Sequence, residues 1–483
     1  MTQAGTTRRV VIEPVTRVEG HGRVTILLDE QSRVTQARLH IVEFRGFERF
    51  IQGRPYWEMP VVVQRLCGIC PVSHHLCASK AVDRIVGADH LPPTAEKVRR
   101  LMHYGQIFQS HSLHFFHLAS PDLLFGASAD PDQRNVFGVI AQRRDLAVQA
   151  IQMRKFGQEV IRATAGKKVH GIGAIPGGVN KNLSIPERDA LLAAADQMLQ
   201  WSRDGLALAR AYTTEHFESL AEFGAFESNH LSIVRNDGAM DLYDGGLRAV
   251  APDGATILDH VPVEQYLDVL AEEVRDWSYM KFPFIRSRGP QTGWYRVGPL
   301  ARLNTCDFID TPEAEAARRD FRDFFGERPC PTTMAYHWAR MIETLHAIEK
   351  IIALLNDPDL QGSELGAAGE RRSEGVGVLE APRGTLFHHY RVGDDDLVTM
   401  CNLIVSTTSN NEAMNRSVQK VAEQCLNGRP EITEGMLNSV EVAIRAYDPC
   451  LSCATHAVGR MPLTVELVGP DGALLDRRAR SPE

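Results

Sequence analysis

The sequence lacks a long apolar run, a secretory leader and an excess of basic residues. Within its 483 residues, no apolar stretch approaches the roughly 20 residues that span a bilayer. The first ten residues, MTQAGTTRRV, contain no apolar segment of the signal-peptide type. Lys plus Arg number 53 against 61 for Asp plus Glu, and the formal charge of −8 disfavours a general nucleic-acid binder. We therefore expect a cytoplasmic protein with no membrane span and no nucleic-acid partner.

Cysteine is scarce, and its placement is uneven. Of the nine cysteines, four form two C-x-x-C pairs near opposite ends of the chain, at Cys67 and Cys70 and at Cys450 and Cys453. In a reducing compartment these side chains remain thiols. The scattered cysteines are expected to be small buried side chains; they are Cys77, Cys306, Cys330, Cys401 and Cys425.

Each C-x-x-C pair can present two thiolates to one metal ion. Gly68 supplies a turn within the first pair, and Pro449 shapes the chain before the second. Structural zinc sites usually place their two pairs about 15–20 residues apart, whereas here a domain-sized segment separates them. Spacing alone leaves three possibilities open: a redox or catalytic metal, zinc, and unrelated thiols. Thiolates also suit nickel and iron.

The residue patterns predict one α+β unit, with a large helical core and small β regions near both ends. Strand patterns fall within the β-rich ranges 8–45 and 375–406, and helical periodicity covers most of 95–356. The expected helices are 95–118, 136–164, 186–222, 262–277, 312–326 and 331–356, the last starting at Pro331. The expected strands are 9–13, 22–28, 37–42, 375–380, 385–390, 397–405 and 461–468.

Five segments together resemble the large subunit of nickel–iron hydrogenases. They are Thr16-Arg17-Val18-Glu19-Gly20-His21, Arg45-Gly46-Phe47-Glu48, Glu380-Ala381-Pro382-Arg383-Gly384 and the two cysteine pairs. They follow the family order from residue 13 to residue 456. The last motif, Cys-Leu-Ser-Cys-Ala-Thr-His-Ala, is most similar to the cytosolic bidirectional, NAD-reducing group. The resemblance implies a nickel–iron hydrogenase large-subunit-like fold.

The resemblance also implies a nickel–iron centre whose iron carries carbon monoxide and cyanide. Cys67 and Cys450 would bind nickel terminally, and Cys70 and Cys453 would bridge nickel and iron. A metal and a base together can split dihydrogen, a very weak acid. Cys450 would be the first base, and Glu19 would accept the proton next. A partly apolar site can raise the pKa of a carboxyl group enough for it to exchange protons near neutral pH. Arg383 would lie beside the metals, where its permanently charged guanidinium could donate hydrogen bonds to a cyanide nitrogen or face a polarised dihydrogen.

Further residues match supporting positions of the family. Thr407 would bond a cyanide, although Ser406 stands where the family usually has proline. His74 would donate to a bridging sulfur, and Asp448 would orient Arg383. Separately, a magnesium site would use Glu48, the carbonyl of Leu403 and His456. By contrast, His111, His114 and His117 span more than one helix face and are expected to be structural.

The implied activity is reversible heterolytic cleavage of dihydrogen, coupled to NAD reduction through partner subunits. The chain has no G-x-G-x-x-G fingerprint and no third cysteine cluster. Iron–sulfur clusters, FMN and NAD would therefore lie on flavin-containing diaphorase subunits and on an iron–sulfur small subunit. Metal-insertion factors and a maturation peptidase are further partners. The peptidase would cut after His456, so that 1–456 is the catalytic unit and 457–483 is a removable extension.

The alternatives are a different electron acceptor and a non-enzymatic protein. A hydrogenase could pass electrons to deazaflavin or another acceptor. A zinc-stabilised scaffold or a respiratory-complex-like structural subunit would not cleave dihydrogen, although the latter would lack the four metal cysteines.

Overall fold

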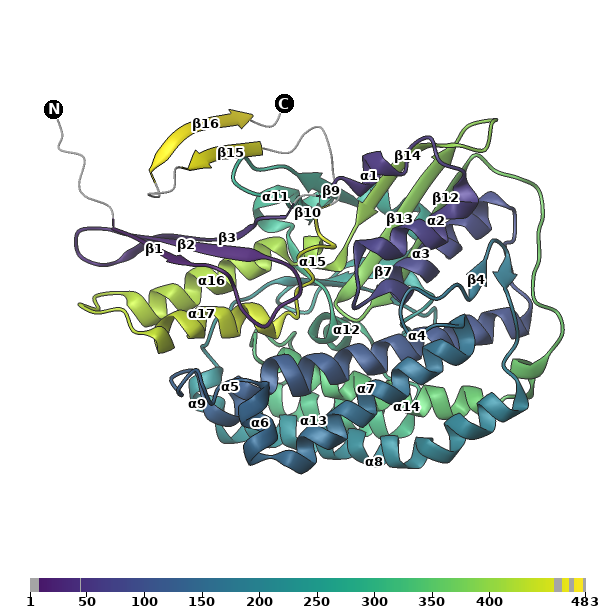
Figure 1. Cartoon of the computed structure of the whole chain (residues 1–483), viewed down its shortest axis with the longest axis horizontal. Helices are drawn as coiled ribbons and strands as arrows, with labels where there is room; N and C mark the ends of the chain where they lie inside the picture. Colours follow the sequence, from purple (N-terminus) through teal and green to yellow (C-terminus); the bar gives the residue numbers. More distant parts are fainter. Residues whose placement is uncertain (1–7, 44, 456–462, 469–472, 481–483) are drawn as a thin grey trace.

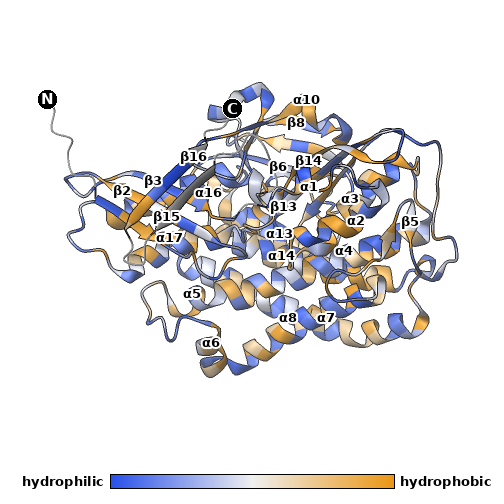
Figure 2. Cartoon of the chain, turned by 45° about the horizontal axis from the view of Figure 1, so that its top comes forward, coloured by the Kyte–Doolittle hydropathy of each residue, from blue (hydrophilic) through white to orange (hydrophobic). Residues whose placement is uncertain are grey.

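Long helices form one side of the molecule and three-stranded sheets lie above them (Figure 1). The computed structural model describes residues 8–43, 45–455, 463–468 and 473–480. The main helices are α4 (Pro93–Leu113), α7 (Arg144–Ala165), α8 (Ile185–Glu215), α13 (Pro312–Phe325) and α14 (Ala335–Leu355). Figure 2 shows apolar and polar residues alternating around these helices, which lets them share one core. The predicted α+β class with a large helical core is confirmed.

Local sequence signals explain where several helices begin and end. At the start of α8, Ser184 and Glu187 form a reciprocal capping box, with Pro186 in the first turn. The expected helix 95–118 is longer than predicted, because α4 continues through a π-helical segment (His114–Ala119) into α5 (Ser120–Phe125). The expected helix 136–164 breaks at Arg143 into α6 (Val136–Gln142) and α7.

The two β regions that flank the metal-binding motifs have the predicted strands. Near the amino terminus, β1 (Arg8–Ile12), β2 (Gly22–Leu28) and β3 (Val34–Ile41) form an antiparallel sheet. Late in the chain, β12 (Glu374–Ala381), β13 (Gly384–Val392) and β14 (Val398–Ile404) form another. The apolar run 397–405 is therefore a strand, despite its weak alternation. Residues 463–468 and 474–480 pair as β15 (Leu463–Val468) and β16 (Leu474–Arg480).

Two helix predictions need correction. The segment 262–277 contains only one turn of 3₁₀ helix (Val263–Gln265) and the short α10 (Tyr266–Val269) before β9 (Leu270–Glu273). Pairing of β9 with β10 (Phe282–Ile285) overrides the helical spacing of its apolar residues. Likewise, Pro331 does not start a helix, because α14 begins at Ala335.

Other elements were not anticipated. A four-stranded sheet lies inside the range expected to be helical; its strands are β6 (Asn229–Val234), β7 (Gly246–Val250), β8 (Thr256–Val261) and β11 (Tyr295–Arg296). All six residues of β6 are buried, so its sequence shows no polar alternation. Three helices near the motifs were also missed: α3 (Pro71–Ile85), α16 (Asn411–Leu426) and α17 (Glu434–Ala446).

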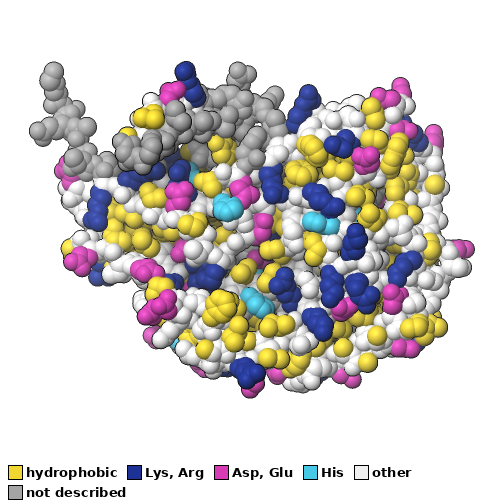
Figure 3. Space-filling view, in the orientation of Figure 1, with side chains coloured by type: hydrophobic (Ala, Val, Ile, Leu, Met, Phe, Trp, Pro, Cys, Tyr) yellow, Lys and Arg dark blue, Asp and Glu magenta, His cyan; other side chains and the backbone are white. Residues whose placement is uncertain are grey.

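The surface combines charge with exposed apolar side chains. On the face in Figure 3, acidic and basic side chains alternate with apolar ones. On α6 and α7, the exposed apolar residues are Phe137, Ile140, Val148 and Ile151. Within the described ranges, no helix has both the length and the apolar character needed to cross a membrane.

Candidate metal centre

The fold brings the two C-x-x-C pairs together in one buried cluster. Cys67 follows a short 3₁₀ helix (Val63–Leu66), and Cys70 is the N-cap of α3. Cys450 and Cys453 follow α17. The four sulfur atoms lie within 4.8 Å of one another. Cys67 Sγ is 3.3 Å from Cys450 Sγ, and Cys70 Sγ is 3.8 Å from Cys453 Sγ. Four thiols at these separations form a ready ligand set for soft metal ions.

Burial and neighbouring groups shift the pKa values of two of the thiols in opposite directions. Burial opposes ionisation of Cys67, but hydrogen bonds from the other three thiols and the charge of Arg383 hold its pKa well below the usual value. Backbone amides of Ile69 and Cys70 also donate to Cys67 Sγ, at 3.2 and 3.1 Å. Burial raises the pKa of Cys450 well above its usual value. Thiols bind a metal in their deprotonated form, so metal binding at this cluster would release protons.

Glu19 reaches this cluster through a direct contact with Cys450. The Cys450 thiol donates to Glu19 Oε2 at 2.9 Å. Ser452 holds the carboxylate: its amide donates to Oε2 at 3.2 Å, and its hydroxyl donates to Oε1. The backbones of Glu19 and Cys450 form a β-bridge, in which Leu451 N donates to Glu19 O at 2.9 Å. The partly buried Glu19 is thus placed for proton exchange with a sulfur of the cluster.

Gly20 permits this close approach of the two chain ends. Its φ of 83° lies in the left-handed region. A Cβ atom at this position would lie 2.7 Å from Ser452 N and 2.9 Å from Leu451 Cβ. The motif Thr16–His21 therefore needs glycine for both backbone conformation and space.

Arg383 lies in the turn between β12 and β13 and points at the same cluster. Its Nε donates to Asp448 O at 2.6 Å, and its Nη2 donates to Asp448 Oδ1 at 3.0 Å. The predicted orienting contact of Asp448 is therefore present. Burial alone would lower the pKa of Arg383, but Asp448 and the nearby thiols raise it well above its usual value. Among the described residues, Arg383 Nη1 has no hydrogen-bond partner although it is buried.

Arg302 supports the turn that carries Arg383, a role that the sequence did not reveal. Its guanidinium is fully buried and forms ion pairs with Glu343 and Glu380. It also donates to the carbonyl oxygens of Ala381 and Pro382, at 3.1 and 3.3 Å. Because Pro382 immediately precedes Arg383, these bonds fix the backbone from which Arg383 extends. Removing one partner of such buried pairs typically costs about 3–5 kcal/mol of stability.

Thr407 and His74 also border the cluster. Both line a small cavity whose wall also includes Cys70, Cys450 and Cys453. Thr407 Oγ1 accepts a hydrogen bond from Cys450 N at 2.9 Å, which leaves its own proton available. His74 Nδ1 lies 3.1 Å from His388 Nε2. The structure therefore brings both predicted side chains to the cavity wall.

The expected magnesium ligands are only partly described. Leu403 N donates to Glu48 Oε1 at 2.9 Å, so these two positions are adjacent. Lys281 Nζ is 4.0 Å from Glu48 Oε1 and 3.0 Å from Glu272 Oε2, a partly buried charge group that the sequence did not indicate. His456 lies outside the described residues.

The three histidines of the 111–117 segment have separate surroundings. His111 Nε2 lies 2.9 Å from Glu343 Oε2, whereas His114 Nε2 donates to Arg445 O at 2.7 Å. His117 is only partly buried. They are absent from the one group of metal-ligand side chains found among the described residues.

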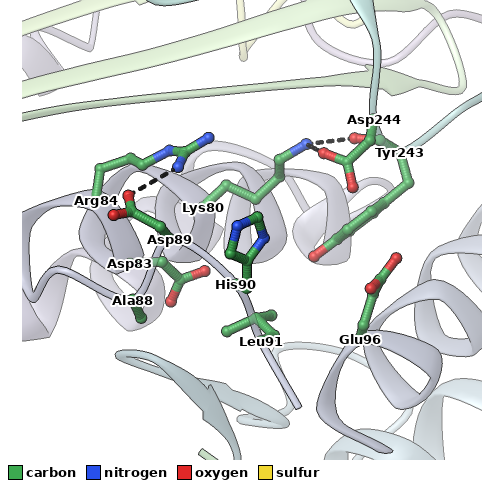
Figure 4. Close-up of a pocket in the computed structure, with 10 residues that line it drawn as sticks. All are labelled: Lys80, Asp83, Arg84, Ala88, Asp89, His90, Leu91, Glu96, Tyr243 and Asp244. Atoms are coloured by element: carbon green, nitrogen blue, oxygen red, sulfur yellow. Dashed lines mark hydrogen bonds and ion pairs between the residues drawn. The ribbon is translucent and has the colours of Figure 1, made fainter. Parts of the chain in front are cut away.

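A second hollow lies at the carboxyl end of α3 (Figure 4). Lys80 Nζ points to the carbonyl of Tyr243 and to Asp244, and Arg84 pairs with Asp89. Every carboxylate of this hollow is in an ion pair; they are Asp83, Asp89, Glu96 and Asp244. Charges paired in this way leave no free ligand set among the described residues of the hollow, and none of these residues belongs to the cysteine cluster.

The donor set fits a metal centre with small anionic ligands. Four sulfur atoms can hold soft metals, and the unpartnered Arg383 Nη1 together with the available Thr407 proton can bond ligand atoms that accept hydrogen bonds. The apolar side chains of Leu386, Val405 and Pro382 line another part of the cavity.

Comparisons with known proteins agree along most of the chain. A family model described as nickel-dependent hydrogenase matches residues 45–136 and 234–456, and a model described as HoxL-like matches residues 9–44. The beta subunit of the NAD-reducing hydrogenase HoxS of Cupriavidus necator is 48% identical over 98% of this chain and 100% of that protein. One subunit of the F420-non-reducing hydrogenase Vhu of Methanococcus voltae is 45% identical over 86% of this chain and 98% of that protein.

The fold of this chain also matches that of a solved hydrogenase structure. The crystal structure of an NAD+-reducing NiFe hydrogenase in the H2-reduced state superposes with a TM-score of 0.92. Its sequence is 60% identical, and the match covers 94% of this chain and 100% of that chain.

The close approach at Gly20 predicts a specific cost for Gly20→Ala. The left-handed backbone alone should cost about 1–2 kcal/mol, and the clash with Ser452 should add about 1–3 kcal/mol. Gly53→Ala is the matched control, because Gly53 has φ 80° but no atom within 4 Å of its would-be Cβ. Calorimetric melting of both variants should show the larger fall for Gly20→Ala. Equal melting temperatures would contradict the packing argument.

Proposed function

This chain belongs to the nickel-dependent hydrogenase family, and we propose that it is the catalytic subunit of an NAD-reducing nickel–iron hydrogenase. The observation that carries the proposal is the contact of Glu19 with a sulfur of the buried four-cysteine cluster. A structural site needs only the thiols. A hydrogenase needs the thiols and also a proton acceptor beside them.

The residues around the cavity would hold a nickel–iron centre with carbon monoxide and cyanide on iron. Cys67, Cys70, Cys450 and Cys453 would hold the two metals through their thiolates. When bound, this centre would supply the heterolytic cleavage of dihydrogen into protons and electrons. Arg383 Nη1 and Thr407 Oγ1 would each donate a hydrogen bond to a cyanide nitrogen.

Within the chain, Cys450 and Glu19 form the proposed proton path. Cys450 Sγ accepts the first proton and passes it across the 2.9 Å contact to Glu19 Oε2. Ser452 holds the carboxylate in place through both of its oxygens, so that the acceptor does not rotate away. His74 is proposed to tune a bridging sulfur from the cavity wall.

Electrons would leave through partner subunits. The HoxS relative is named as one subunit of a larger NAD-reducing enzyme. We propose that the partners are an iron–sulfur small subunit, which would receive the electrons first, and flavin-containing diaphorase subunits, which would carry FMN and the NAD site. Because NAD is held inside cells, we place the complex in the cytoplasm.

A separate magnesium ion is part of the proposal. Glu48, the carbonyl of Leu403 and His456 would be its ligands. The adjacency of Glu48 and Leu403 supports this assignment. Carboxylate and carbonyl oxygens are the ligands that magnesium prefers.

Oxidation of dihydrogen with NAD as the acceptor tests the proposed function. The purified native complex should reduce NAD under dihydrogen and should form dihydrogen from NADH in the reverse assay. Deazaflavin serves as the competing acceptor in parallel reactions. Dihydrogen-dependent reduction of deazaflavin but not of NAD would assign a different acceptor, and inactivity with every acceptor would overturn the enzymatic proposal.

Glu19→Gln separates proton transfer from assembly of the centre. The amide keeps the shape of the side chain but cannot accept the proton, so exchange of deuterium gas with water should fall by about 10²–10⁴-fold. Nickel and iron contents should remain those of the wild type. Glu30→Gln, at an exposed turn, is the control and should retain full exchange. Normal exchange in Glu19→Gln would exclude this path.

Maturation gives a prediction for the carboxyl terminus. We propose that metal-insertion factors load the centre and that a peptidase then cuts between His456 and Ala457. Intact-mass measurement of active enzyme should find a chain ending at His456, whereas the full-length form should be inactive. Active enzyme that retains residues 457–483 would contradict this proposal.

A further inference from the structure

The metal cavity contains a hydrogen-bond donor that the proposed function has not used. Ser73 lines the cavity together with Cys70, Arg383 and Thr407. It is fully buried, and among the described residues its hydroxyl has no hydrogen-bond partner. An unpartnered buried hydroxyl costs about 1–3 kcal/mol, so a group that accepts its proton is expected in the occupied cavity.

The position of Ser73 on α3 fixes its hydroxyl close to the metal ligands. Ser73 lies one helical turn after Cys70, and its amide donates to Cys70 O at 3.2 Å. Pro71 and Val72 complete this first turn. The side chain therefore projects from the same rigid turn that presents a proposed bridging sulfur.

Neighbouring hydroxyls in the same region are already engaged. Ser406 Oγ donates to Gly384 O at 2.7 Å. Ser79 Oγ, two turns further along α3, donates to His75 O at 2.8 Å. The carbonyl four residues before Ser73 is that of Ile69, which precedes α3 and accepts hydrogen bonds from Gln106 and Gln109. The hydroxyl of Ser73 therefore lacks the backbone bond that Ser79 makes, and it borders the cavity, where it can donate to a bound group.

We infer that the Ser73 hydroxyl donates a hydrogen bond to a cyanide nitrogen of the nickel–iron centre. The inference rests on the proposed function, because it needs the cyanide ligands. Cyanide nitrogen is anionic and accepts hydrogen bonds, whereas carbon monoxide accepts them poorly. Together with Arg383 Nη1 and Thr407 Oγ1, Ser73 would be a third hydrogen-bond donor to the cyanide ligands. Such bonds hold the ligands in a fixed orientation and withdraw electron density from iron.

Infrared spectroscopy of the assembled complex tests this inference. A hydrogen bond to the nitrogen raises the stretching frequency of a metal-bound cyanide, so Ser73→Ala should move one cyanide band to lower frequency. Ser73→Thr keeps the hydroxyl and should leave that band near its wild-type position. Ser79→Ala is the matched control, because it removes a buried hydroxyl from the same helix that is bonded to a carbonyl. Its spectrum should equal that of the wild type.

The possible results separate the inference from the proposed function. Wild-type bands for carbon monoxide and cyanide with no shift in Ser73→Ala would overturn the inference and leave the proposed centre intact. An equal shift of every carbon monoxide and cyanide band would also overturn it, since that pattern places the bond on a sulfur. Absence of these bands from the wild type would overturn the proposed centre itself. Where Ser73→Ala and Ser73→Gly both fail to assemble a centre but Ser73→Thr succeeds, the need for the hydroxyl supports the inference.

Discussion

The junction of residues 19–20 with residues 450–452 is the constraint on which the site depends. The backbone bridge between Glu19 and Cys450 joins the β-rich start of the chain to the loop after α17. It brings the Glu19 carboxylate within hydrogen-bond distance of Cys450 Sγ. The other two thiols of the cluster, Cys67 and Cys70, come from the segment that leads into α3. Without this junction the two cysteine pairs could still bind metals, but no proton acceptor would touch them.

The second requirement is that the charged side chains buried near the site have partners of opposite charge. Arg383 is compensated by Asp448, and Arg302 by Glu343 and Glu380. Pairs of this kind seldom raise stability, since desolvation offsets attraction. Their benefit here is positional: Arg302 fixes the turn, and Asp448 leaves one nitrogen of Arg383 directed at the cavity. The hydrogen-bond donors around the cavity are thus preorganised before any ligand is bound.

Local motifs pointed to the candidate site residues, whereas features that depend on contacts between distant residues could not be predicted from the sequence. The cysteine pairs and Glu19 lie in short segments whose composition carries the resemblance to the family. The contacts of Arg302 and Ser73 depend on residues far away or on an absent partner, and neither leaves a mark in local sequence. The prediction of a helix at 262–277 was wrong for the same reason. The apolar spacing fits a helix, but part of the segment forms β9, which pairs with β10. The buried strand β6 lacked the alternation that identifies half-exposed strands.

Elemental analysis of the native complex tests the central claim most directly, namely that the four-cysteine cluster is a nickel–iron centre. Cys67, Cys70, Cys450 and Cys453 form the one such cluster among the described residues. We predict one nickel atom for each copy of this chain, and loss of that nickel when Cys450 is replaced by Ser. We also predict more iron than the iron–sulfur clusters of the partner subunits account for. Zinc in place of nickel, or nickel that remains in the variant, would contradict the account.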